Sequence, residues 1–113
     1  MLKIVLMLKD TELKTIETDQ ETITIGRNNN NDIHINNLGV SKKHAAITCQ
    51  NGSHFIEDLN STNGTLLNNE KSTKAGLSGK DVITIGKHTL FVSIKEDSTA
   101  TQGMSEATIK ITP

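Results

Sequence analysis

A serine, a histidine and an aspartate are the residues of this sequence whose types could support nucleophilic catalysis. Ser41 and His44 lie close together in "GVSKKHAAI", and Asp58 follows in "HFIEDL". A hydrolase needs the hydroxyl, the imidazole and the carboxylate within mutual hydrogen-bond reach. The serine lacks a G-x-S-x-G elbow, and the sequence shows no oxyanion hole. We therefore expect a protein that is not an enzyme.

Two other kinds of chemical site are also poorly supported. The histidines His34, His44 and His54 lack H-E-x-x-H or paired Cys/His spacing, so they predict no metal site. The segment "AGLSGKDV" has glycines and a lysine, but no Ser or Thr follows Lys80 as a phosphate-binding loop requires. We expect no cofactor.

Composition excludes several classes of partner. The chain has 113 residues with 12 basic and 13 acidic side chains, and it has two Phe, no Trp and no Tyr. Such a balance of charges produces no positive electrostatic field that would attract nucleic acid or an anionic membrane. The aromatic side chains that stack on bases are also lacking. The apolar start "MLKIVLMLKD" contains Lys3 and lacks a cleavage site, so it does not read as a signal peptide. We expect one soluble, cytoplasmic domain in which Cys49 is a buried strand thiol.

Short runs with β character recur along the chain, with turn residues between them. Such runs predict an all-β sandwich or barrel with little helix. Asn51-Gly52 lies between two of them and predicts a hairpin turn. The predicted strands are Leu2–Leu8, Glu12–Thr18, Thr22–Gly26, Asp32–Ile35, Ala45–Gln50, His54–Leu59, Asp81–Gly86 and His88–Ile94. The apolar pattern then ends, so we expect a folded domain of residues 1–95 and a flexible tail of residues 96–113.

Three loop motifs follow one another between these strands. The first is "GRNNNN", in which Arg27 opens a loop at a strand end; the second is "SKKH"; the third is "NSTNGT". Asparagine and glycine suit turns, and a lone arginine is usually a solvated charge. Each motif alone therefore indicates only a shaped loop.

Taken together and in this order, the motifs resemble the forkhead-associated domain, a phosphothreonine-binding module. The resemblance covers roughly residues 2–95. It implies an all-β fold of the SMAD/FHA type, a two-sheet β-sandwich of about eleven mostly antiparallel strands.

The resemblance also implies roles for individual residues. Arg27 would hold the phosphate, Ser41 would donate its hydroxyl, and Lys42 and Thr62 would add contacts. Asn63 would hydrogen-bond the backbone of the ligand. The positions that would brace the loops are Gly26, His44 and Gly64. Arginine is frequent in the family where this chain has Lys42, and lysine lacks the planar fork that grips two oxygens.

We therefore expect a module that recruits a protein phosphorylated on threonine by a Ser/Thr kinase. An assembly sandwich that binds an unphosphorylated protein surface is the alternative. The tail sequence "ATIKITP" also suggests a self-ligand, in which phosphorylated Thr108 would occupy the site of its own chain or, with self-association, that of a second copy. The alternatives are an unstructured tail and an extra edge strand with Ile109 and Ile111.

Overall fold

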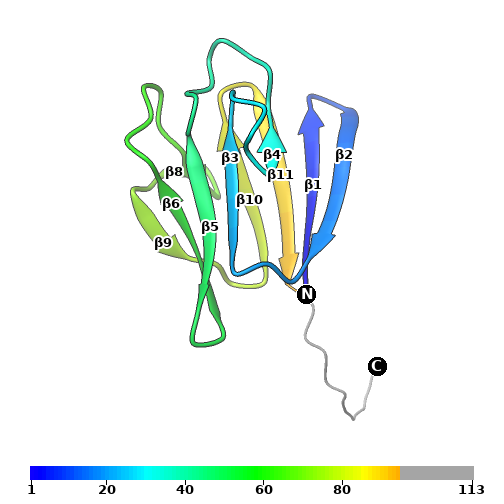
Figure 1. Ribbon diagram of the computed structural model, residues 1–113, viewed down its shortest axis with the longest axis vertical. Coiled ribbons are helices and arrows are strands. Elements are labelled where there is room, and N and C mark those ends of the chain that lie inside the picture. The colour runs from blue at the N-terminus through cyan, green and yellow to red at the C-terminus, as the bar shows by residue number, and fades with distance from the viewer. Residues whose placement is uncertain (95–113) are drawn as a thin grey trace.

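The computed structural model describes residues 1–94, and these residues form an all-β sandwich without helices (Figure 1). The eleven strands are β1 (Leu2–Leu8), β2 (Thr11–Thr18), β3 (Thr22–Gly26), β4 (Ile33–His34), β5 (Ala45–Gln50), β6 (Ser53–Asp58), β7 (Leu66–Leu67), β8 (Glu70–Lys71), β9 (Lys74–Gly76), β10 (Lys80–Ile85) and β11 (His88–Ile94). No helix among the described residues has the length and apolarity to cross a membrane. The predicted fold class is confirmed.

The strands form two sheets. One has six strands in the order β2-β1-β11-β10-β7-β8, and the other has five in the order β4-β3-β5-β6-β9. Every pairing is antiparallel except β3 with β4, which is parallel. The first and last strands are therefore neighbours, since β1 pairs with β11 along its whole length.

The core lies between the sheets and consists of Ile, Leu, Val and Ala side chains. Alternation in the sequence produces it: β10 buries Ile83 and Ile85, while β3 buries Ile23 and Ile25. Each such side chain contributes about 1.5–3 kcal/mol when it is fully buried. A one-residue shift in register would turn these side chains to solvent, so the pattern fixes the pairing.

Most strand predictions are confirmed to within a residue or two. Three short strands, β7, β8 and β9, were not predicted, because two or three residues are too few to show periodicity. The Asn51-Gly52 turn is confirmed: φ is +53° at Asn51 and +82° at Gly52, as a hairpin turn of this type requires. The prediction for Cys49 is wrong in part, because the residue is on β5 but only half-buried.

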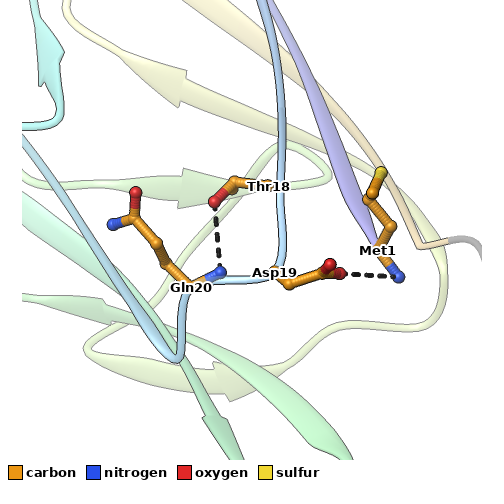
Figure 2. Close-up of polar contacts among 4 residues, drawn as sticks. All are labelled: Met1, Thr18, Asp19 and Gln20. Atoms are coloured by element: carbon orange, nitrogen blue, oxygen red, sulfur yellow. Dashed lines mark hydrogen bonds and ion pairs between the residues drawn. The ribbon is translucent and has the colours of Figure 1, made fainter.

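The chain begins at the end of the sandwich where β2 connects to β3. The N-terminal amine lies 3.6 Å from the carboxylate of Asp19, and the backbone N–H of Gln20 donates to Thr18 Oγ1 at 3.1 Å; both contacts are drawn in Figure 2. The loops that follow β3, β4 and β6 lie at the opposite end (Figure 1). The predicted boundary at residue 95, the tail and Thr108 lie outside the described residues.

Candidate functional site

Three loops meet at the end of the sandwich farthest from the start of the chain, and we call this the binding end. They are residues 27–32, 35–44 and 59–65. Hydrogen bonds join them: the Arg27 N–H donates to the Ser41 carbonyl at 2.9 Å, and Asn63 Nδ2 donates to the Gly39 carbonyl at 2.9 Å. The three loop motifs of the sequence therefore form one surface.

Gly26 ends β3 where the second loop crosses it. A Cβ there would lie 2.2 Å from the carbonyl oxygen of Lys42 and 2.8 Å from Asn31 Nδ2. Only glycine permits this approach of two backbones. The Asn31 amide then binds the loops together, because its Nδ2 donates to the carbonyls of Asn28 and Lys42, both at 2.8 Å.

Arg27 is half-buried and anchored at one point of its side chain. Its Nε donates to the carbonyl of Val40 at 3.1 Å. The terminal nitrogens of the guanidinium make no hydrogen bond or ion pair within residues 1–94. The side chain is thus held in place while its strongest donors stay available to an anion.

Ser41 is tied to the third loop through its hydroxyl. Its Oγ accepts a hydrogen bond from the backbone N–H of Thr62 at 3.0 Å. A hydroxyl has one hydrogen to donate, and within the described residues that of Ser41 has no acceptor. The bond to Thr62 fixes the oxygen, so the hydroxyl hydrogen is available to a ligand.

His44 is fully buried and links the second loop to the third. Its Nδ1 accepts from the backbone N–H of Ser41 at 3.0 Å, and its Nε2 lies 2.8 Å from the carbonyl of Gly64. Because Nδ1 is an acceptor, the ring is neutral and its hydrogen is on Nε2, which donates to Gly64. The imidazole is therefore a brace between two loops.

The third loop is shaped by Asp58 and Ser61. The carboxylate of Asp58 accepts from the N–H and hydroxyl of Ser61 and from the hydroxyl of Thr65, while the Gly64 N–H donates to Ser61 Oγ at 2.9 Å. Burial on its own raises the pKa of Asp58, but these hydrogen bonds outweigh it and hold the pKa below its ordinary value. Gly64 adopts φ +85°, which allows the turn that presents Asn63.

Lys42 and Thr62 are exposed at the binding end, and their side chains make no hydrogen bond or ion pair within residues 1–94. Asn63 is exposed too, and only its Nδ2 is engaged. The oxygen of its amide remains available as an acceptor.

An open groove of about 740 Å³ runs beside Asn63 toward the β10–β11 turn. Its lining includes Leu38, which is 92 % exposed, and Lys87. The sequence interpretation did not include this groove. The signal available was Leu38, an apolar residue in a loop of asparagines and glycine.

The alternative chemistries find no support in this geometry. The ring of His44 bonds the backbone of Ser41 and not its hydroxyl, while Asp58 is occupied by Ser61 and Thr65. The triad considered above is therefore not assembled. Within the described part of the chain, no group of three or more His, Cys, Asp or Glu side chains could hold a metal ion.

Comparison with known proteins identifies the fold family. The FHA domain model matches residues 23–86, more than half of the chain. The chain belongs to the FHA domain family. The matched range contains Gly26, Asp58 and all three loops of the binding end.

Relatives of this FHA domain include regulatory proteins. The chain is 39% identical over 72 residues to the oxoglutarate dehydrogenase inhibitor of Corynebacterium diphtheriae, covering 64% of this chain and 50% of that protein. It is 36% identical over 72 residues to the glycogen accumulation regulator GarA of Mycolicibacterium smegmatis, covering 64% of this chain and 46% of GarA. The chain thus matches about half the length of these curated relatives.

A solved structure from a study of phosphothreonine-dependent FHA domain interactions is also similar. It shares 30% sequence identity, covers 83% of this chain and 98% of its own, and superposes with a TM-score of 0.73. The architecture of this FHA domain is therefore that of a family member whose interactions depend on phosphothreonine.

Proposed function

We propose that this FHA domain is a non-enzymatic recognition module that binds phosphothreonine peptides. It would thereby recruit partner proteins phosphorylated by a Ser/Thr kinase. The observation that carries this proposal is that the side chains of Arg27 and Ser41 are each anchored by one hydrogen bond, while their remaining side-chain donors have no acceptor within residues 1–94.

The chemistry of the binding end suits a phosphate. A phosphorylated threonine carries nearly two negative charges and three acceptor oxygens at neutral pH. The guanidinium of Arg27 and the hydroxyl of Ser41 supply donors for these oxygens, and Lys42 and Thr62 can add to them. Charge-assisted bonds of this kind are about twice as strong as neutral ones.

Specificity for a peptide would come from Asn63 and the adjoining groove. Asn63 can accept from, and donate to, the backbone of an extended ligand, as the family resemblance implies. The groove would receive side chains next to the phosphothreonine, between apolar Leu38 and Leu66 and cationic Lys87. The binding end therefore offers a phosphopeptide both cationic side chains for its phosphate and a groove for its neighbouring side chains.

Two further proposals concern the whole protein. The first is a binding domain of residues 1–95 followed by a tail of residues 96–113, because the apolar pattern of the sequence ends near Lys95. A cytoplasmic location suits both the half-buried free thiol of Cys49 and a role downstream of a kinase.

Three peptides of one sequence test the proposal by calorimetry: one with phosphothreonine, one with threonine and one with phosphoserine. We expect binding of the phosphothreonine peptide and none of the unmodified one. The methyl group of threonine is worth about 0.8 kcal/mol if it is buried, so phosphoserine should bind a few-fold more weakly. Equal binding of the unmodified peptide would instead support the alternative of an assembly sandwich.

A further inference from the structure

The outer face of the six-stranded sheet carries a row of apolar side chains. Val5 on β1 and Val82 on β10 both lie directly opposite Phe91 on β11, so the three are side by side on one face. Phe91 is 44 % exposed. On the outer face of the other sheet, by contrast, Phe55 has the ammonium of Lys74 5.5 Å from its ring centre.

Charges of opposite sign flank this apolar row. In the neighbouring row of the same face, Glu17 on β2 lies opposite Lys3, Lys3 lies opposite Ser93, and Ser93 lies opposite Lys80 on β10. Glu17 and Lys80 are exposed and make no ion pair within residues 1–94. Three strand spacings separate them, about 14 Å, which is too far for a pair within one chain.

We propose that a second copy of this chain covers the face, related by a two-fold axis parallel to the strands between β1 and β11. Such an axis places β2 of one copy over β10 of the other and β1 over β11. Val5 then meets Phe91 of the partner subunit, and Glu17 meets Lys80 of the partner subunit. Two sheets stack about 10 Å apart at about 30°, a distance that these side chains can fill.

The charges at the margins of this face favour a second copy of the chain as the partner that covers it. A two-fold contact uses one patch twice, so the patch must be complementary to itself. An apolar centre with Glu17 at one margin and Lys80 at the other meets that condition, because the rotation brings each Glu17 onto a Lys80, while Lys3 comes to lie over an uncharged serine. The contact also covers Phe91, an aromatic residue at the centre of the patch.

The arrangement has a consequence for recognition, which rests on the proposed function. An axis parallel to the strands keeps their direction, so both binding ends point the same way. A dimer would then engage two phosphothreonines of one partner, or of an oligomeric partner, with the gain in affinity that linked sites provide.

Sedimentation equilibrium of the full chain without peptide tests the dimer. We expect the mass to rise from monomer to dimer with concentration. The substitution Phe91→Glu should weaken dimerisation by about tenfold or more, since a central aromatic residue is replaced by a charge. A wild-type protein that stays monomeric at every concentration would overturn the proposal.

A charge exchange tests the geometry of the contact. Glu17→Lys and Lys80→Glu should each weaken the dimer by placing like charges together, and the double variant should restore it. Lys14→Glu is the matched control, because Lys14 lies on the same strand as Glu17 but pairs with buried Leu6 on the other face. A double variant no better than the single ones would exclude this stacking.

Phosphopeptide binding separates this proposal from the proposed function. The Phe91→Glu variant should bind a single phosphothreonine peptide in solution as the wild type does, which also shows that it is folded. A monomeric wild type that binds the peptide refutes only the dimer. A dimer that binds no phosphopeptide supports this contact and refutes only the proposed function.

Discussion

The hydroxyl oxygen of Ser41 accepts a hydrogen bond from the backbone N–H of Thr62 at 3.0 Å. With the bonds of Asn63 to Gly39 and of His44 to Gly64, this contact joins the loop after β4 to the loop after β6, and it leaves the hydroxyl hydrogen free to donate. A residue with this arrangement can position one loop and donate to a ligand at the same time.

Ser41→Ala should therefore weaken phosphothreonine binding strongly and stability only modestly. A hydrogen bond to a charged group is worth about 1.5–3 kcal/mol, or roughly tenfold or more in affinity. Calorimetry and denaturant unfolding on the same variant separate the two effects. Ser53→Ala, at the opposite end of the sandwich, is the control and should change neither; an equal loss of affinity in both variants would contradict the role of Ser41.

His44 should matter through the loops that it joins. His44→Ala leaves the Ser41 N–H and the Gly64 carbonyl without their partner, and each unsatisfied buried group costs about 1–3 kcal/mol. We expect a clear fall in unfolding free energy and weaker phosphopeptide binding. Backbone amide exchange should accelerate in residues 35–44 and 59–65 of the variant. Unchanged exchange there would show that the imidazole does not brace the loops.

Gly26→Ala should disturb the binding end by steric overlap. The new Cβ would meet the Lys42 carbonyl oxygen at 2.2 Å, and overpacking costs about 1–3 kcal/mol. Gly76→Ala is a matched control on a strand, because its Cβ would meet only Phe55 at 3.8 Å. Thermal unfolding should show a lower midpoint for Gly26→Ala alone. If the two variants unfold alike, the close approach at Gly26 does not constrain the fold.

Acid should destabilise the domain in two stages. Burial lowers the pKa of His88 below its ordinary value of 6.5, so the folded state disfavours its charged form. Stability should therefore fall as the pH drops below that value, where the unfolded chain takes up a proton first. The pKa values of the Asp32, Asp58 and Asp81 carboxyls are also lowered, from an ordinary value of 3.8. The stability that these carboxylates contribute is therefore lost only below about that pH, as they become protonated.

His88→Leu isolates the first stage. The His88 Nδ1 is buried without a hydrogen-bond partner within the described residues, so removal of the ring nitrogens should be tolerated. Unfolding midpoints of the variant should depend less on pH between about 7 and 5 than those of the wild type. Phosphopeptide affinity should still decline over this range in both proteins, because the second pKa of the phosphate is about 6. A midpoint that falls equally in both proteins would contradict the assignment to His88.

The sequence predicted most of this fold because buried strands impose a period of two. Ile23 and Ile25 on β3 show that period, whereas β2 is an edge strand that is exposed at most positions and alternates poorly. The binding loops were found through the order of their motifs. The role of Asn31 was not predicted, because a run of four asparagines does not indicate which side chain turns inward to donate to two carbonyls.

Titration of Arg27→Ala with a phosphothreonine peptide tests the central claim most directly. Nε of Arg27 is held by the Val40 carbonyl while its terminal nitrogens have no partner within residues 1–94, so these should bind the phosphate. The loss of a hydrogen-bonded charge partner costs about 2–5 kcal/mol, which is roughly thirtyfold or more in affinity. Arg27→Lys should recover part of that loss, since it restores the charge without the fork. A correctly folded Arg27→Ala variant that binds within about twofold of the wild type, well under the 1.4 kcal/mol of a tenfold change, would contradict the account.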